Sequence, residues 1–305
     1  MLLDTASLYF RAFFGVPDTK RAPDGTPVHA VRGMLDFVTR LVADHSPDAV
    51  VACWDDDWRP AFRVDLVPTY KAHRVAGAAA GAAESAGEPA GAVVEEVPDL
   101  LSVQVPFIRA ALPAIGVPVI GSPGFEADDV IGTLTSRTTD EVDVVTGDRD
   151  LFQLVEDRVR VLYTARGVRR LESVDDAWLL AKYGVTGQQY TDFATLRGDA
   201  SDGLPGVKGI GEKTAAALLS EHGDLASILA AAADEDTTMR PAVRSALLAS
   251  GTYIEAAVQV VAVRRDLPID VPASRPDPVA AQRIAEQLGI ERTMGRAAAA
   301  VAQLG

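Results

Sequence analysis

Cysteine is almost absent from this chain of 305 residues. The one cysteine, Cys53, stands in the hydrophobic run AVVACW. A single thiol excludes an internal disulfide and a zinc site built from several thiolates. We therefore interpret Cys53 as a buried, inert thiol and place the protein in a reducing compartment.

Long uncharged apolar runs and targeting signals are missing as well. The first residues, MLLDTASLYFRAFF, have neither the basic start nor the long apolar centre of a signal peptide. No apolar run reaches the length that crosses a bilayer. We expect a cytoplasmic protein with no membrane partner.

Basic residues are in the minority. The 29 Lys and Arg face 43 Asp and Glu, which gives a formal net charge of −14. Coating nucleic acid or anionic lipid without specificity needs a broad basic surface, so that class of protein is excluded. If the protein binds a polyanion, a local cluster of basic residues must form the binding site.

Three short apolar runs each end in an aspartate: MLLD at Asp4, AVVACWD at Asp55 and VDVVTGD at Asp148. Between them lie segments of helical period, such as residues 28–45, where apolar side chains recur at steps of three and four. This alternation predicts an α/β fold with a mostly parallel sheet flanked by helices. Ligands of such sheets bind beyond the carboxyl ends of the strands, so we expect an acidic cleft along one sheet edge.

Residues 75–97 break the pattern, because Ala and Gly dominate and neither aromatic nor basic residues occur there. The segment is interpreted as a flexible or partly helical insertion, with a linker and a mobile functional lid as alternatives. After about residue 180 the strand signals stop and Ala- and Leu-rich helical segments follow. The predicted domains are an α/β core at 1–180 with an insertion at about 68–105, and a helical region at 181–305 with a hairpin element at about 199–222.

Besides Asp4 and Asp55, six acidic residues stand out by their setting: Glu126 and Asp128 in GFEADDVIGTL, Asp148 and Asp150 in TGDRDLFQL, and Asp199 and Asp202 in GDASDG. Together with Asp4 and Asp55 they would bring strong repulsion to one cleft unless cations neutralise them. Glu126, Asp128 and Asp129 enter a helix, where an acid also serves as a cap, but capping does not need three acids. Oxygen ligands without His or Cys favour Mg²⁺ or Mn²⁺, and the acids suffice for two ions. Two such ions are typical of phosphodiester hydrolysis.

The segment LPGVKGIGEKTAAALL follows the last acidic pair. Gly209 and Gly211 free the backbone of a turn that Lys208 and Lys213 flank, and a helix then begins. Backbone N–H groups in such a turn can bind phosphate oxygens without reading a base, although a helix end followed by a turn uses the same residues. We interpret the segment as a phosphate-binding site.

The motifs LLDTASLYFRAFF, PTYKAHR, GFEADDVIGTL, TGDRDLFQL and GDASDGLPGVKGIGEKTA occur together in this order. Over nearly its full length the chain resembles the bacterial 5′ to 3′ exonuclease and flap endonuclease family, as a stand-alone relative of the nuclease domain of DNA polymerase I. The resemblance implies a PIN-like (resolvase-like) sheet core, a helical arch over the active site and a helix-three-turn-helix element that grips duplex DNA. It also implies a monomer near the bacterial nucleoid that acts on DNA with 5′ flaps, nicks or free 5′ ends, or on RNA–DNA hybrids.

The resemblance assigns roles by position. One metal would be held by Asp4, Asp55, Glu126 and Asp128, the other by Asp148, Asp150, Asp199 and Asp202, with Asp129 as a further acid. Asp56 is the alternative to Asp55. Lys71 and Arg74 would orient the scissile phosphate, Tyr70 would stack on a terminal base, and Arg11 would contact DNA, with an exposed helix arginine as its alternative reading. Lys208, Gly209, Gly211 and Lys213 would form the hairpin, which in the family can also hold a monovalent cation such as K⁺.

Two other functions remain open at this stage. Asp148 and Asp150 could serve as the DxD pair of an aspartyl-phosphate phosphatase, but Phe152 stands where such enzymes have a threonine. Alternatively, the chain binds DNA structures without cutting them, against which the complete set of acids argues.

Overall fold

The structure, a computed structural model, describes residues 1–75, 97–236, 238–273 and 275–304. Most of the expected insertion, residues 76–96, therefore lies outside the described residues. Within the described ranges no helix has the length and apolarity needed to span a bilayer.

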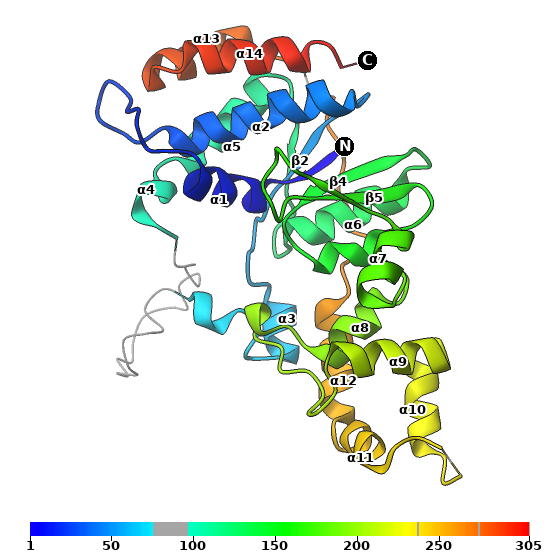
Figure 1. Cartoon of the computed structure of the whole chain (residues 1–305). Helices are drawn as coiled ribbons and strands as arrows, with labels where there is room; N and C mark the ends of the chain where they lie inside the picture. The colour runs from blue at the N-terminus through cyan, green and yellow to red at the C-terminus, as the bar shows by residue number, and fades with distance from the viewer. Residues whose placement is uncertain (76–96, 237, 274, 305) are drawn as a thin grey trace, which may run out of the picture.

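A six-stranded sheet organises the first half of the chain (Figure 1). Its order is β3-β2-β1-β4-β5-β6, and every neighbouring pair is parallel except β5 with β6. The strands are β1 (Leu2–Asp4), β2 (Val51–Cys53), β3 (Val119–Ile120), β4 (Val142–Thr146), β5 (Val159–Tyr163) and β6 (Glu172–Val174). The predicted α/β fold with a mostly parallel sheet is confirmed.

Both faces of the sheet are buried, as the apolar strands indicate. Successive strand residues point to opposite faces, so Leu2 and Val144 belong to one apolar core whereas Leu3 and Val145 belong to the other. The helices of this half are α1 (Thr5–Gly15), α2 (His29–His45), α3 (Ala61–Leu66), α4 (Asp99–Ser102), α5 (Val105–Ala114), α6 (Ala127–Arg137) and α7 (Asp176–Tyr183), with short 3₁₀ turns η1 (Ala72–Arg74) and η2 (Asp150–Leu154).

The second half is helical below the sheet, as Figure 1 shows. It contains α8 (Tyr190–Arg197), η3 (Ala200–Asp202), α9 (Glu212–His222), α10 (Leu225–Ala233), α11 (Pro241–Ala249) and α12 (Gly251–Val261). Its apolar core continues that of one sheet face, since Val130 and Ile131 of α6 lie in the same cluster as Phe193 of α8.

The last two helices correct the predicted domain boundary. The helices α13 (Pro278–Leu288) and α14 (Glu291–Val301) return to the α/β core and cover α2 and α5 (Figure 1). Their apolar side chains, such as Ile284, Leu288 and Met294, belong to the core of the opposite sheet face. A helical period predicts the helix but not its partner, so the sequence placed these two helices with the wrong region.

Candidate active site

Three acidic residues meet at the carboxyl edge of the sheet. Asp4 ends β1, Asp55 follows β2 by two residues, and Asp148 follows β4 by two residues. Because β1 lies between β2 and β4, the three strand ends are neighbours. With Glu126 and Asp128 they line one cavity of about 220 Å³, which we call the acid pocket.

Asp4 is fixed by two donors. The hydroxyl of Thr146 donates to its Oδ2 at 2.6 Å, and the backbone N–H of Ser7 donates to its Oδ1 at 3.1 Å as Asp4 caps α1. Burial nevertheless raises the pKa of Asp4 to about 6. The site therefore disfavours the charged form that a metal ligand needs.

Asp55, rather than Asp56, faces the acid pocket. The backbone N–H of Ala127 donates to Asp55 at 2.6 Å, whereas Asp56 pairs with Arg109 at 2.9 Å outside the pocket. Burial, with added repulsion from Glu126 and Asp4, raises the pKa of Asp55 to about 7.

Glu126 is the most heavily bonded acid. Its Oε2 accepts from Arg63 Nη1 at 2.5 Å and from the hydroxyl of Tyr70 at 2.7 Å, and its Oε1 accepts from Lys71 Nζ. Burial pushes the pKa of Glu126 upward, but Lys71 and Arg63 outweigh it and lower the pKa overall. The sequence analysis did not single out Arg63, whose signal was an arginine among the apolar side chains at the start of the helix AFRVDL.

Asp128 and Asp129 separate. Asp128 lines the acid pocket, where burial and then Asp148 and Asp4 raise its pKa well above the usual range. Asp129 is fully buried away from it, accepts from both terminal nitrogens of Arg63 at 2.9 and 2.7 Å, and accepts from the backbone of Arg264 at 2.8 Å. These partners hold Asp129 outside the acid pocket, so it does not face the cavity where the metal ligands are expected.

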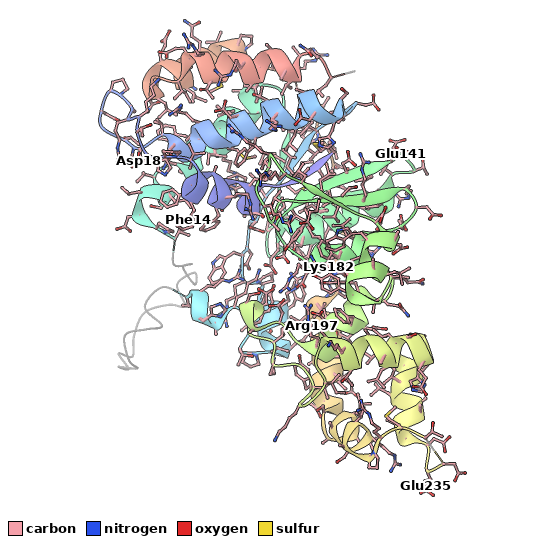
Figure 2. All side chains as sticks on the ribbon, viewed as in Figure 1. Phe14, Asp18, Glu141, Lys182, Arg197 and Glu235 are labelled. Atoms are coloured by element: carbon pink, nitrogen blue, oxygen red, sulfur yellow. The ribbon has the colours of Figure 1, made fainter. Side chains whose placement is uncertain are left out.

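The remaining acids form a second group next to Asp148. Burial and then repulsion from Asp148 and Asp202 raise the pKa of Asp150 well above its usual range, and burial raises that of Asp202 to about 6. Asp202 pairs with Arg74 at 2.7 Å. Asp199 is bound by Arg149 at 3.1 Å and by Arg197, labelled in Figure 2, at 3.5 Å.

The chemistry of these donors fits a hard divalent ion, because the acid pocket offers carboxylate oxygens and no imidazole or thiolate. Among the described residues, however, no three acidic, histidine or cysteine side chains are placed so that they could hold an ion as they stand. Lys71 and Arg63 at Glu126, and Arg74 at Asp202, neutralise the acids instead. The structure thus shows the donor set without a preformed coordination cage.

The predicted basic pair lies beside the acids. Lys71 and Arg74 line the acid pocket, and Lys71 has a left-handed backbone with φ of 48°. The N–H of Lys71 donates to the carbonyl of Asp202 at 3.0 Å, and Arg74 donates to the carbonyl of Ser201 at 2.8 Å. These bonds tie the two segments together, and the strained backbone of Lys71 is typical of a functional site.

Tyr70 differs from the expectation. Only 4% of its surface is exposed, because its ring packs in the core below the pocket and its hydroxyl is bonded to Glu126. A buried ring cannot stack on a base in this conformation, where the hydroxyl of Tyr70 holds Glu126 instead, so the expected stacking stays a prediction.

The hairpin between α8 and α9, residues 198–211, contains Lys208, Gly209 and Gly211, and Lys213 follows in the first turn of α9. Lys208, Gly209, Gly211 and Lys213 are all exposed, and a Cβ on either glycine would meet no atom within 4 Å. The backbone of these residues, at the start of α9, is therefore open to a ligand.

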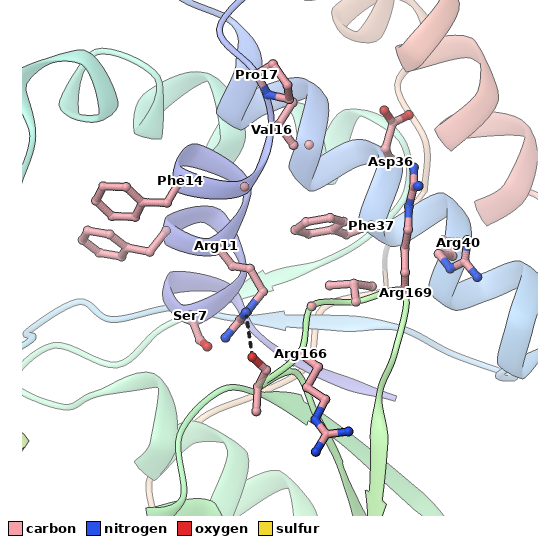
Figure 3. Close-up of a pocket in the computed structure, with 16 residues that line it drawn as sticks. Ser7, Arg11, Phe14, Val16, Pro17, Asp36, Phe37, Arg40, Arg166 and Arg169 are labelled. Carbon is pink, nitrogen blue, oxygen red and sulfur yellow. Dashed lines mark hydrogen bonds between the residues drawn. The ribbon is translucent and has the colours of Figure 1, made fainter.

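Arg11 lies in a different groove, shown in Figure 3, of about 1200 Å³ between α1, α2 and the loop after β5. Its guanidinium reaches the carbonyl of Ala165 at 3.5 Å, while its buried Nε has no hydrogen-bond partner among the described residues. Arg40, Arg166 and Arg169 line the same groove. The basic run ARGVRR was the signal that the sequence analysis passed over.

A resolvase-like α/β core with an acid pocket, joined to a helical region with a hairpin, defines the class of protein. Residues 1–184 match the 5′-3′ exonuclease N-terminal resolvase-like domain, and residues 185–283 match the 5′-3′ exonuclease C-terminal SAM fold. The chain belongs to the 5′-3′ exonuclease family.

Similar proteins extend over almost the whole chain. A 5′-3′ exonuclease of Streptomyces coelicolor is 55% identical over 97% of this chain and 98% of its own, and one of Mycobacterium tuberculosis is 47% identical over 97% and 95%. DNA polymerase I of Mycobacterium tuberculosis is 38% identical over 91% of this chain but 28% of its own length.

Solved structures share the fold at low identity. The T5 5′-exonuclease with bound zinc ions has a TM-score of 0.65 at 16% identity, covering 100% of this chain and 98% of that one. Flap endonuclease-1 from Methanococcus jannaschii has a TM-score of 0.60 at 14% identity, covering 100% and 93%. The predicted PIN-like core with a helical second region is confirmed by these comparisons.

Proposed function

We propose that this protein is a divalent-metal-dependent 5′-nuclease that hydrolyses DNA phosphodiesters, as a 5′-flap endonuclease and a 5′-3′ exonuclease in replication and repair. The observation that carries the proposal is the gathering of Asp4, Asp55, Glu126, Asp128 and Asp148 around one pocket that Lys71 and Arg74 also line. Substrates would be DNA with 5′ flaps, nicks or free 5′ ends, and RNA primers paired with DNA.

The proposed metal ligands are Asp4, Asp55, Glu126 and Asp128 on one side and Asp148, Asp150, Asp199 and Asp202 on the other. Two or more Mg²⁺ or Mn²⁺ ions, when bound, would activate a water and stabilise the leaving oxygen of the cleaved phosphodiester. Support comes from the raised pKa values of Asp4 and Asp55, which mark carboxylates whose charge needs a cation.

The chain's own cations have the complementary task. Lys71 pairs with Glu126 of the pocket and Arg74 pairs with Asp202 of the second group, and each would turn from its acid to a phosphate oxygen of bound DNA. The exposed hairpin with Lys208, Gly209, Gly211 and Lys213 would bind phosphates of the duplex, and K⁺ at its carbonyls would complete it. Arg11 would contact DNA from the groove between α1, α2 and the loop after β5, where its Nε, without a hydrogen-bond partner among the described residues, supports a ligand.

We further propose that the enzyme works as a monomer at the nucleoid in the bacterial cytoplasm. The chain pairs a strongly acidic composition with local cation clusters, which suits recognition of a DNA structure and not coating of DNA.

A test compares a 5′-flap duplex, with and without Mg²⁺, and p-nitrophenyl phosphate as a small phosphomonoester. We expect Mg²⁺-dependent cleavage near the flap junction and no turnover of the monoester. Turnover of p-nitrophenyl phosphate alone would replace the proposal with a phosphatase, and binding of the flap without cleavage would replace it with a structure-specific DNA-binding protein.

A further inference from the structure

One buried arginine joins the acid pocket to the helical region. Arg63 of α3 is 2% exposed, and three of its nitrogens are used by acceptors from two other parts of the chain. Its Nε donates to the carbonyl of Val260 at 2.9 Å, while its terminal nitrogens reach Glu126 and Asp129. A fork of donors in one plane fixes the direction of every group that it binds.

At Glu126 this fork leaves one oxygen for the pocket. Arg63 and Tyr70 both donate to Oε2, at 2.5 and 2.7 Å, so two protein donors occupy that oxygen. Oε1 is bonded to Lys71, a residue that lines the pocket. The arrangement holds Oε2 in the protein and turns Oε1 toward the cavity.

The other end of Arg63 leads to the hairpin. Val260 lies in the last turn of α12, and the hydroxyl of Tyr253 on the same helix accepts from the hairpin N–H of Gly206 at 2.9 Å. One continuous helix thus contacts both the hairpin and the arginine that holds Glu126.

We propose that Arg63 is a positioning residue that, anchored by α12 and Asp129, presents a single oxygen of Glu126 to the metal of the acid pocket. The inference rests on the proposed metal-dependent nuclease. Because Arg63 does not line the pocket and, among the described residues, reaches it through Glu126, its contribution is to the orientation of that carboxylate and not to contact with the substrate. Groups that orient a metal ligand typically change metal affinity by about 10–100-fold when altered.

The decisive variant is Arg63→Lys, which keeps the charge but loses the fork. Arg137→Lys is the control, because Arg137 of α6 likewise joins α6 to a distant backbone segment, donating to the carbonyls of Leu267 and Ile269, without contacting Glu126. Mn²⁺ binding to the DNA-free protein is measured by electron paramagnetic resonance or calorimetry, beside kcat and KM on the flap duplex and thermal melting without metal.

We expect Arg63→Lys to weaken Mn²⁺ binding by about 10-fold or more and to lower kcat with little change in KM, whereas Arg137→Lys changes only the melting temperature. Equal Mn²⁺ affinity in Arg63→Lys and wild type would overturn the role of Arg63, and so would an equal loss in Arg137→Lys. Failure of the wild type itself to bind Mn²⁺ or to cleave would instead refute the proposed function.

A second variant keeps the test decisive if Arg63→Lys does not fold. Asp129→Asn leaves the arginine in place but removes one of its two charged acceptors. We expect a smaller loss of Mn²⁺ affinity, of several-fold, because the fork is then held less firmly. Unchanged affinity in a folded Asp129→Asn protein would contradict the proposal.

Discussion

The acid pocket and the hairpin are built in opposite ways. In the pocket, burial raises the pKa values of Asp4 and Asp55, so the protein holds these two charges where they are costly. In the hairpin, Lys208 and Gly209 are exposed and the space around the glycine is open. Catalysis on a phosphodiester needs functional groups whose positions are fixed before the substrate binds. Binding of the DNA backbone needs hydrogen-bond donors and cations that the phosphates can reach.

The largest effect should follow from removing one carboxylate of the pocket. For Asp148→Asn we expect cleavage of the flap duplex to fall on the order of 10³-fold, while duplex binding stays equal or improves because a repulsive charge is lost. Single-turnover cleavage with Mg²⁺ and a gel-shift titration without cleavage measure the two properties.

The matched control is Asp143→Asn. Asp143 lies on the same strand, β4, but pairs with Arg160 at 2.5 Å outside the acid pocket. The rate of cleavage by this variant should remain within about twofold of wild type, because an ion pair near the surface contributes little to stability. Cleavage of the flap duplex by Asp148→Asn at the wild-type rate would contradict the proposed role of Asp148.

The second test concerns the rigid part of the hairpin. A Cβ on Gly206, which has φ of 70°, would come within 2.4 Å of the carbonyl oxygen of Arg197, whereas Gly209, with φ of 81°, has open space. We expect Gly206→Ala to lower the free energy of unfolding by about 3 kcal/mol and Gly209→Ala by about 1 kcal/mol. Urea denaturation compares the two, and equal effects would show that the hairpin is not held as tightly at Gly206 as its contacts indicate.

The third test uses pH to expose the cost of the buried acids. Burial raises the pKa of Asp55 to about 7, above its value in the unfolded chain. Between about pH 4 and pH 7 the native protein then holds a proton that the unfolded chain has released, so this group lowers stability as pH rises through that window. Its penalty is fully present above about pH 7.

Asp55→Asn removes the titration. Without metal, the variant should gain roughly 2 kcal/mol of stability relative to wild type between about pH 5 and pH 8, and Mg²⁺ should stabilise the wild type more at the higher pH. Denaturation curves in EDTA at both pH values measure the difference. A constant difference between the two proteins across this range would contradict the raised pKa.

The contrast also explains what the sequence could and could not predict. Apolar strands that end in aspartates predicted the sheet edge where Asp4, Asp55 and Asp148 meet, because parallel strands share that edge. The exposed turn at Gly209 and Gly211, flanked by Lys208 and Lys213, was equally predictable, because the residue types of a turn depend on its local backbone conformation. Local signals were enough for both.

Contacts between distant segments were not predictable in this way. Asp129 follows Asp128 directly in the sequence, yet it lies outside the pocket and is paired with Arg63 of another helix. The return of α14 to α2 likewise depends on which apolar faces fit, which a helical period does not reveal. The proposed metal ligands stay predictions, because the chain's own cations neutralise several of them in this structure.

The smallest effect is expected at the hairpin surface and tests whether Lys208 meets a phosphate at all. For Lys208→Ala the duplex affinity should fall modestly, and the plot of log affinity against log salt should become shallower by about one unit, because one fewer counterion is released. Lys182→Ala is the control: this lysine of α7 lies over the ring of Trp178 at 4.3 Å and outside the hairpin, so its removal should leave the slope unchanged. If the salt dependence became equally shallow in both variants, duplex binding would depend on the protein's overall charge. That result would contradict a specific phosphate contact at Lys208.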